Sequence, residues 1–594
     1  MSLRAAAAFA ALVVAVTIHS APPAHAAGPS GELAKLCEEY WQGTLKAHPT
    51  AATGLGDKRY DDRLSDITPA GNAAEEQRLT AVLARVRAIE AASLTAADQV
   101  THTSLVTEVD GQLASLRCHL EEWIVDPLSG PQVGFMNLAD YTLIDTPRDG
   151  ANFVKRCRAM GKSIDDHIAN LKTGLAKGKT ASRDAVTKVI GQLEGLTSSP
   201  AESLAVWKPA TTERKGWSAA DRDRFSQELR GAIATSLRPA LQRYHEFLKS
   251  QVLPAARPPE KAGLVALPDG VDCYSRLIRV HTSLEMTPEE IHEIGLGQVA
   301  KFRRDLGALG ARALGTSDVT SIQKKLRGDS AMHFRTPDEV EAKAREALAR
   351  ARVAVPQWFG RIQPQAAYEV KVMGMHEAPY STIAYYRQPS TDRKRPGYYM
   401  INTWKPETRP RYEAEALAFH EAIPGHHLQI AVAQELQGVP EFRKHQGVTA
   451  YVEGWALYTE RLSEEMGLYS SDIDRIGMLS YDAWRSCRLV VDTGLHAMGW
   501  TRQQAIDYMI ENSCLAENNI VNEVDRYLTW PGQALAYKIG QLEILRLRDE
   551  VRQRLGDRFD IREFHDVVLG NGAVALPVLR QLVQGYLAQA EAMR

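Results

Sequence analysis

Residues 420–427 read HEAIPGHH, so a His-Glu pair and a His-His pair stand close together in the chain. The flanking segments RYEAEALAF and LQIAVAQEL carry apolar residues three and four positions apart, a spacing that predicts helix on both sides. In zinc hydrolases imidazoles hold the metal, and a neighbouring carboxylate takes a proton from the metal-bound water. The stretch therefore predicts a catalytic Zn²⁺ site on helical elements, with His420 as a ligand and Glu421 as the general base.

The second ligand is ambiguous because the common HExxH spacing would place it where this chain has Pro424. By helical rotation His427 lies almost in line with His420, but the two are separated by about 10.5 Å of rise. Pro424 lacks an N–H and Gly425 tolerates unusual dihedral angles, so a kink or bulge is expected here. We predict that this distortion makes His426 the second ligand, and His427 is the alternative.

The third ligand is expected on the segment TAYVEGWALYTERL, residues 449–462, which has a helical pattern. Glu453 stands there among apolar and aromatic neighbours, and a carboxylate in such surroundings needs a cation to offset its burial. A salt bridge to Arg461 is the alternative explanation. Glu460 is a weaker competitor, expected on the opposite side of the helix.

Four motifs resemble those of the bacterial proteins grouped as domain of unknown function 885, DUF885: HEAIPGHHLQ, EGWALYTERL, RLVVDTGLHAMGWTRQQAIDYM and RYLTWPGQALAYKIGQLEILRLR. The resemblance covers nearly the whole chain from about Cys37. That family is similar, over three short pieces, to the glutamate-type zinc peptidases that include angiotensin-converting enzyme and the thimet oligopeptidases. The resemblance implies a mainly α fold: a two-lobed helical body with a deep cleft and a small β-sheet near the metal helix.

In those peptidases HExxH supplies two ligands and the base, a glutamate on a later helix is the third ligand, and an Arg-Tyr pair stabilises the transition state. His420 and Glu421 match the first pair, and Gly425-His426 resembles the end of that motif. Glu453 matches the third ligand. Arg526-Tyr527 resembles the late pair. The two-residue insertion around Pro424 is where this chain departs from the pattern.

Further catalytic groups are expected in the C-terminal third of the chain. Tyr537 follows Tyr527 and is a second phenol that could donate a hydrogen bond to a developing oxyanion. Arg488, Asp492 and His496 recur every four residues, so Asp492 could orient the His496 imidazole towards the site. The alternative for this trio is an ordinary ionic ladder on a solvated helix face.

Strands are expected only around residues 367–403. The aromatic and β-branched runs at 384–387 and 396–403 predict a hairpin. A sheet edge of this kind can bind an extended peptide through its main chain, although the hairpin could equally just cover the core.

The first 26 residues predict a secretory signal peptide, because a short basic start precedes the apolar run AAAAFAALVVAVTI and the cleavage pattern Ala24-His25-Ala26. The mature protein is expected to start near Ala27 and to be secreted or periplasmic. No other run reaches the roughly 20 apolar residues that a membrane span needs, so stable membrane insertion is not expected. A net charge of −2 with dispersed Lys and Arg excludes a nucleic-acid footprint. The six cysteines allow up to three disulfides.

Helical periodicity predicts helices over 74–95, 150–176, 221–250, 287–308, 337–352 and 535–554. The Pro- and Gly-rich stretch 251–270 predicts a boundary between an N-terminal helical part, residues 27–260, and a metal-bearing catalytic part, residues 261–594. These features favour a secreted zinc peptidase that hydrolyses oligopeptides. A metal-dependent amidohydrolase or esterase, and an inactive extracytoplasmic binding protein, are the alternatives.

Overall fold

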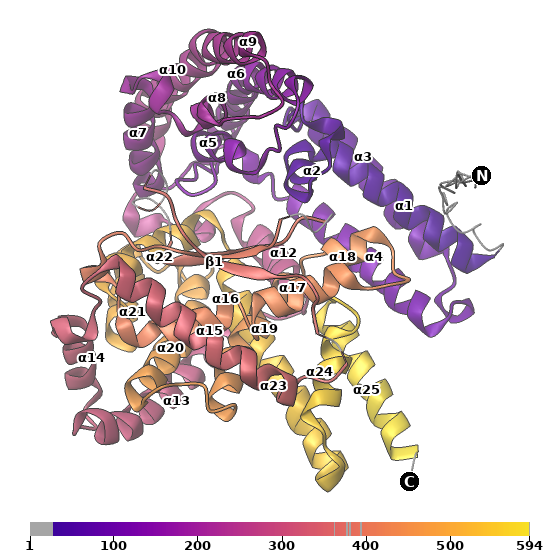
Figure 1. The fold of residues 1–594 in the computed structure, drawn as a ribbon, viewed down its shortest axis with the longest axis vertical. Helices are drawn as coiled ribbons and strands as arrows, with labels where there is room; N and C mark the ends of the chain where they lie inside the picture. The colour runs from indigo at the N-terminus through magenta and orange to yellow at the C-terminus, as the bar shows by residue number, and fades with distance from the viewer. Residues whose placement is uncertain (1–27, 362, 376–377, 379–381, 392–394, 593–594) are drawn as a thin grey trace, which may run out of the picture.

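The computed structural model describes residues 28–592 except 362, 376–377, 379–381 and 392–394. The described chain is mainly helical and holds one three-stranded sheet, which confirms the predicted mainly α fold class (Figure 1). No helix in the described ranges is both long and apolar enough to cross a membrane. The predicted signal peptide, 1–26, lies outside the described residues.

The first part of the chain is a series of helices, of which α5 to α10 form the upper layer of the molecule (Figure 1). Their bounds are α1 Pro29–Ala47, α2 Pro49–Leu55, α3 Pro69–Ala88, α4 Ala96–Leu116, α5 Pro131–Tyr141, α6 Pro147–Ala176, α7 Arg183–Ser198, α8 Lys208–Thr211, α9 Ala219–Ala232, α10 Arg238–Phe247 and α11 Leu253–Ala255. The helix predicted over 74–95 is wrong at its end: α3 stops at Ala88, and the Thr95 hydroxyl caps the start of α4 by accepting from the Asp98 N–H.

The later helices surround the HEAIPGHH stretch. Their bounds are α12 Gly270–Thr282, α13 Pro288–Leu314, α14 Val319–Gly328, α15 Pro337–Trp358, α16 Ala414–Glu421, α17 His426–Glu435, α18 Glu441–His445, α19 Thr449–Glu465, α20 Asp472–His496, α21 Arg502–Asn512, α22 Glu517–Thr529, α23 Ala536–Leu555, α24 Ile561–Leu569 and α25 Leu576–Ala592. From Ile476 onward α20 is buried at every position except Trp484, which makes it the central helix of this part.

Helices α19 and α23 approach one another closely because both have glycine at the crossing. A Cβ added at Gly454 would lie 2.5 Å from the backbone of Gly540, and one added at Gly540 would lie 1.8 Å from the carbonyl oxygen of Ala450. Only glycine leaves room for this approach. The crossing therefore brings the residues next to Gly454 on α19 close to Gly540 and Gln541 of α23.

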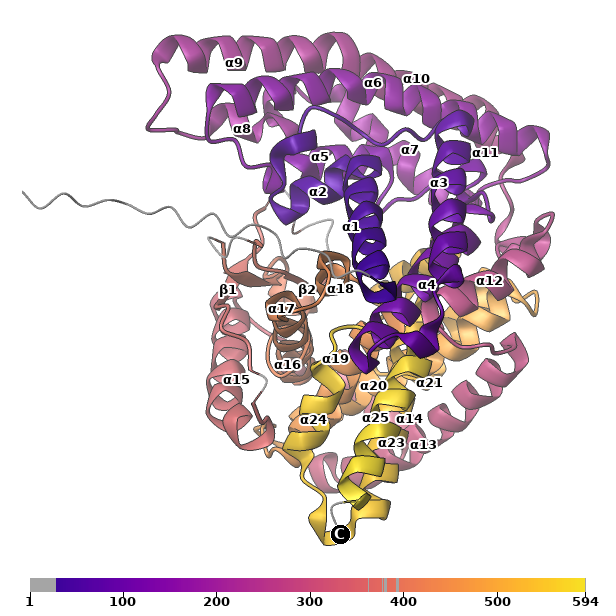
Figure 2. The same cartoon turned by 90° about the vertical axis from the view of Figure 1, so that its right-hand side faces the viewer.

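The sheet has the order β1-β3-β2, with β1 Tyr368–Val372, β2 Ala384–Arg387 and β3 Gly397–Ile401. The antiparallel β2–β3 pair confirms the predicted hairpin. Strand β1 pairs parallel to β3, which the sequence did not predict. The sheet lies beside α15, α16 and α17, so it borders the helices that carry the His-Glu and His-His pairs (Figure 2).

The buried apolar residues form several clusters, and one of them lies entirely within residues 125–256, on the N-terminal side of the predicted boundary. A second cluster joins helices α1, α3 and α4 to Phe442 of α18. Helices α1, α3 and α4 thus share a core with the later part of the chain. The division into parts at 251–270 stays a prediction.

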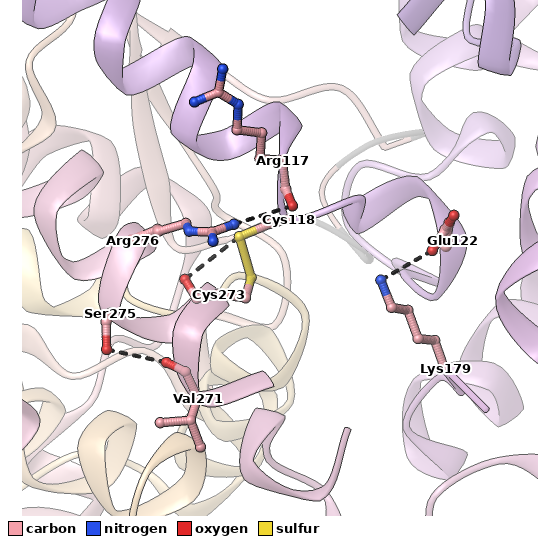
Figure 3. Close-up of a disulfide and its surroundings, with 8 residues drawn as sticks. All are labelled: Arg117, Cys118, Glu122, Lys179, Val271, Cys273, Ser275 and Arg276. Carbon is pink, nitrogen blue, oxygen red and sulfur yellow. Dashed lines mark hydrogen bonds and ion pairs between the residues drawn. A yellow bond between two sulfur atoms is a disulfide. The ribbon is translucent and has the colours of Figure 1, made fainter. Parts of the chain in front are cut away.

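Only one of the three disulfides that six cysteines allow forms in the described chain. It joins Cys118, just after α4, to Cys273 of α12 (Figure 3). The free thiols are all buried, at Cys37, Cys157, Cys487 and Cys514. Burial raises the pKa of Cys37 and of Cys157 to about 12, so these thiols stay protonated at neutral pH.

Candidate metal centre

The HEAIPGHH stretch contains the end of one helix, a turn and the start of a second helix, not the kinked or bulged single helix that we expected. Helix α16 ends at Glu421, residues 422–425 turn, and α17 starts at His426. A Cβ at Gly425 would lie 2.0 Å from the carbonyl oxygen of His420, so the turn is too tight for any side chain at that position. The Ile423–Pro424 peptide bond is cis. The Trp455 indole N–H donates to the Pro424 carbonyl at 3.1 Å and ties the turn to α19.

This turn places His426 beside His420, opposite Glu453 of α19. The Glu453 Oε2 atom lies 3.4 Å from His426 Nε2 and 3.7 Å from His420 Nε2. One donor atom from each of the three side chains lies within 4.8 Å of the other two. The structure therefore brings together three of the four predicted ligand residues, and we call them the His-His-Glu cluster.

The His-His-Glu cluster fits a metal ion better than it fits an internal hydrogen-bond network. Glu453 Oε2 is buried and has no hydrogen-bond partner among the described residues. Ligand atoms about 2.0–2.1 Å from a tetrahedral zinc ion lie about 3.3–3.5 Å apart, which is close to the spacing of these atoms. Two imidazoles and one carboxylate also match the donor set of catalytic zinc sites that leave a fourth position open.

Electrostatics in the His-His-Glu cluster favour a cation. Burial alone would raise the pKa of Glu453, but the nearby His426 and His420 outweigh it and hold that pKa well below its ordinary value. Burial alone would lower the pKa of His420, but Glu453 and Glu460 outweigh it and raise the pKa to about 9. Two carboxylates thus stabilise positive charge at His420.

Glu460 is the functional candidate whose position we predicted wrongly. It does not lie on the side of α19 opposite Glu453: its Oε1 accepts a hydrogen bond of 2.8 Å from His420 Nδ1. Residues seven apart lie nearly in line on a helix, and this spacing could have placed Glu460 beside Glu453. A carboxylate behind a metal-binding imidazole fixes the ring orientation and leaves Nε2 for the metal. The alternative partner of Glu453, Arg461, pairs with Asp482 instead.

We expect Glu460→Gln to weaken zinc affinity by about 10–100-fold, because loss of the supporting carboxylate frees the His420 ring. Zinc titration of the metal-free protein measures this. Glu415→Gln is the matched control, since Glu415 lies on α16, is 0 % exposed and bonds Arg350 and Ser470 instead of the cluster. Equal losses of zinc affinity in both variants would contradict a specific role for Glu460.

His427, the alternative second ligand, has both ring nitrogens engaged away from the cluster. Its Nε2–H donates to the Ala366 carbonyl at 3.1 Å, and its Nδ1 accepts from the Tyr386 hydroxyl at 2.8 Å. Burial lowers its pKa to about 4, which keeps the ring neutral. His427 therefore connects α17 to β2 and to Ala366, two residues before β1.

Glu421 is the last residue of α16, directly after His420, and is partly buried. Within the described part of the chain its carboxylate has no hydrogen-bonding partner, so it is available to accept a proton. Tyr399 of β3 lies close to it: burial first, and the Glu421 charge second, hold the pKa of Tyr399 well above its ordinary value. We did not single out Tyr399 from the sequence, where it is one of several aromatic residues in the hairpin.

Of the predicted oxyanion donors, Tyr537 is the one whose pKa the charge of Glu453 raises. It stands in the first turn of α23, and burial together with the Glu453 charge raises its pKa. The Tyr527 hydroxyl is buried and accepts from Arg488 Nε at 2.9 Å and from the Trp484 indole at 3.1 Å. Arg526 makes bonds of 2.9 and 2.8 Å to Glu523 and Gln533.

His496 is not turned towards the cluster by Asp492. Its Nδ1 accepts from the Leu264 N–H at 3.1 Å, and its Nε2–H donates to the Tyr527 carbonyl at 3.0 Å. Asp492 accepts from the Tyr274 hydroxyl at 2.6 Å instead. Burial lowers the pKa of His496 to about 3, so the ring joins main-chain segments as a neutral group. The trio is also no solvated ladder, because all three residues are buried.

The fold and the site together define a mainly helical protein with a His-His-Glu cluster that is suited to a divalent metal. The family model of bacterial proteins of unknown function, DUF885, matches residues 49–583, and the chain belongs to this family. No curated protein matches the sequence at a significant level.

Two solved structures share the fold. A Colwellia psychrerythraea protein, provisionally described as a lipoprotein, superposes with a TM-score of 0.89 at 28% identity, covering 95% of this chain and 100% of that chain. A Shewanella oneidensis protein, described in the same way and as of unknown function, superposes with a TM-score of 0.71 at 19% identity, covering 94% and 100%. The second likeness concerns the fold alone.

Proposed function

We propose that the protein is a secreted or periplasmic zinc-dependent peptidase that hydrolyses oligopeptides. The observation that carries the proposal is the His-His-Glu cluster, in which a buried, unpartnered carboxylate oxygen faces two imidazoles beside the available carboxylate of Glu421. A binding scaffold has no need for such a base. The proposal includes a resemblance to angiotensin-converting enzyme and the thimet oligopeptidases, and with it a two-lobed body and a deep cleft.

His420, His426 and Glu453 would hold the zinc, with Glu460 orienting His420 through Nδ1. When bound, zinc would acidify a water molecule and polarise a carbonyl group. The Glu421 carboxylate takes the proton from the attacking water and delivers it to the leaving amine. Tyr537, whose pKa the charge of Glu453 raises, is the phenol that donates a hydrogen bond to the developing oxyanion.

Purified mature protein is expected to hold about one zinc ion per chain, because the cluster supplies one complete set of three ligands. Metal analysis measures the content, and chelation should abolish hydrolysis that added zinc restores. A digest of a peptide library by the zinc-loaded protein, read by mass spectrometry, tests the peptidase activity. A protein that holds no divalent metal and gains no activity with zinc would contradict the proposal.

The same digest, run beside a panel of small esters and amides, separates the two other functions. An amidohydrolase or esterase would bind zinc and cleave a panel of small esters or amides but no peptides. An inactive binding protein would cleave neither.

A further inference from the structure

Arg488 of α20 holds a buried guanidinium that is incompletely bonded. The residue is 3 % exposed. Its Nε donates to the Tyr527 hydroxyl at 2.9 Å and its Nη2 donates to Glu523 at 2.8 Å. Its Nη1 is buried and has no hydrogen-bond partner among the described residues. A buried cationic donor without a partner is costly, so such a group commonly marks a place where a ligand or water completes the site.

The surroundings of Arg488 carry excess positive charge. Glu523 is shared between two guanidiniums, because Arg526 also donates to its Oε2 at 2.9 Å. The other acidic group that faces both arginines is Asp492, whose pKa burial raises to about 7. Its Oδ1 is engaged by Tyr274 and by the Gly532 N–H. One full carboxylate against two guanidiniums leaves room for a further anion.

The Arg488 guanidinium is linked to the His-His-Glu cluster through the Tyr537 ring and the neighbouring Arg485. The Arg488 guanidinium stacks 4.3 Å from the centre of the Tyr537 ring and 4.4 Å from that of Trp484. The Arg485 guanidinium lies 5.8 Å from the centre of the same Tyr537 ring, and its Nη2 lies 3.7 Å from Glu460 Oε1, the oxygen that bonds His420. A peptide whose scissile bond is held at the cluster would carry its next one or two residues towards Arg488.

We propose that Arg488 is a specificity-determining residue that binds a carboxylate of the substrate, so that the site acts on peptide bonds near a free C-terminus. The planar guanidinium suits a carboxylate, which it can bind with charge-assisted hydrogen bonds. An acidic side chain offers the same chemistry, and the test separates the two sources. The inference rests on the proposed peptidase function.

The test compares three peptides of one sequence with the zinc-loaded protein: a free acid, its C-terminal amide, and an amide whose last residue is Glu. We expect kcat/KM for the free acid to exceed that for the plain amide by about 10- to 100-fold. Arg488→Gln should bring this ratio close to one, mainly through a higher KM for the acid. If the Glu-terminated amide is cleaved as well as the acid, the carboxylate can come from a side chain.

Arg443→Gln is the matched control. Arg443 is also a buried arginine, 1 % exposed, but it bonds Thr101 and Asn571, which are not residues of the cluster. This variant should keep the acid-to-amide ratio. Calorimetric binding of the acid and the amide to zinc-loaded Glu421→Gln protein gives a second readout that needs neither hydrolysis nor a folded Arg488 variant. Equal binding of acid and amide, or an unchanged ratio in Arg488→Gln, overturns the inference. Failure to cleave any peptide, with the acid still bound more tightly, overturns the peptidase proposal alone.

Discussion

Glu421→Gln is expected to yield a folded, zinc-loaded protein whose peptide hydrolysis is slower by about 10²–10⁴-fold or more. The amide keeps the size of the carboxylate but accepts no proton at neutral pH. Glu421 follows His420 at the end of α16 and is not one of the three cluster residues, so zinc should stay bound. Turnover number and zinc content, measured on the same preparation, test this expectation.

The matched control is Glu453→Gln, the same change at a cluster residue. It removes an anionic oxygen that faces both imidazoles, so this protein should be zinc-poor and regain part of its activity at high zinc. The two variants should therefore fail in different ways. Turnover close to that of the parent protein in Glu421→Gln would remove the general base from the proposal, and equal zinc loss in both would mean that Glu421 is itself a ligand.

Loss of a residue that supports a metal ligand typically lowers zinc affinity by about 10–100-fold. His426→Ala is expected to lower zinc affinity by more than this, because it removes one of the three ligands. His427→Ala should keep zinc. Its ring bonds Ala366 and Tyr386, so its loss should lower the free energy of unfolding by about 1–3 kcal/mol. Zinc titration and thermal unfolding of both variants measure the two effects. Zinc loss in His427→Ala with retention in His426→Ala would reverse the ligand assignment.

Much of the fold was readable from local patterns. The helix predicted over 150–176 is α6, Pro147–Ala176, and the hairpin predicted near 384–403 is the β2–β3 pair. Both depend on side-chain periodicity and on caps and turns a few residues away. The parallel β1–β3 pair was missed because nothing in residues 368–372 specifies a partner nearly 30 positions later. The end of α3 was predicted too late, because Thr95 was included in that helix although it caps the start of α4.

The candidate site divides in the same way. Residue types and spacing were enough to name His420, His426, Glu421 and Glu453, because zinc chemistry demands particular donors and the chain contains few such groupings. The sequence also predicted a distortion at Pro424 and Gly425. It did not show that the chain leaves the helix altogether there, in a turn so tight that a Cβ added at Gly425 would lie 2.0 Å from the His420 carbonyl oxygen.

The order of residues therefore determined the mainly helical class, the small sheet and the identity of the cluster residues, all of which follow from local periodicity and side-chain chemistry. Only the tertiary structure decided which groups face one another. It turned His427 towards Tyr386, joined His496 to the main chain at Leu264 and Tyr527, and placed Glu460 behind His420. These outcomes depend on how separate helices pack, including the glycine crossing of α19 and α23. A side chain's partners come from elements that are distant in the chain, and local spacing carries no information about them.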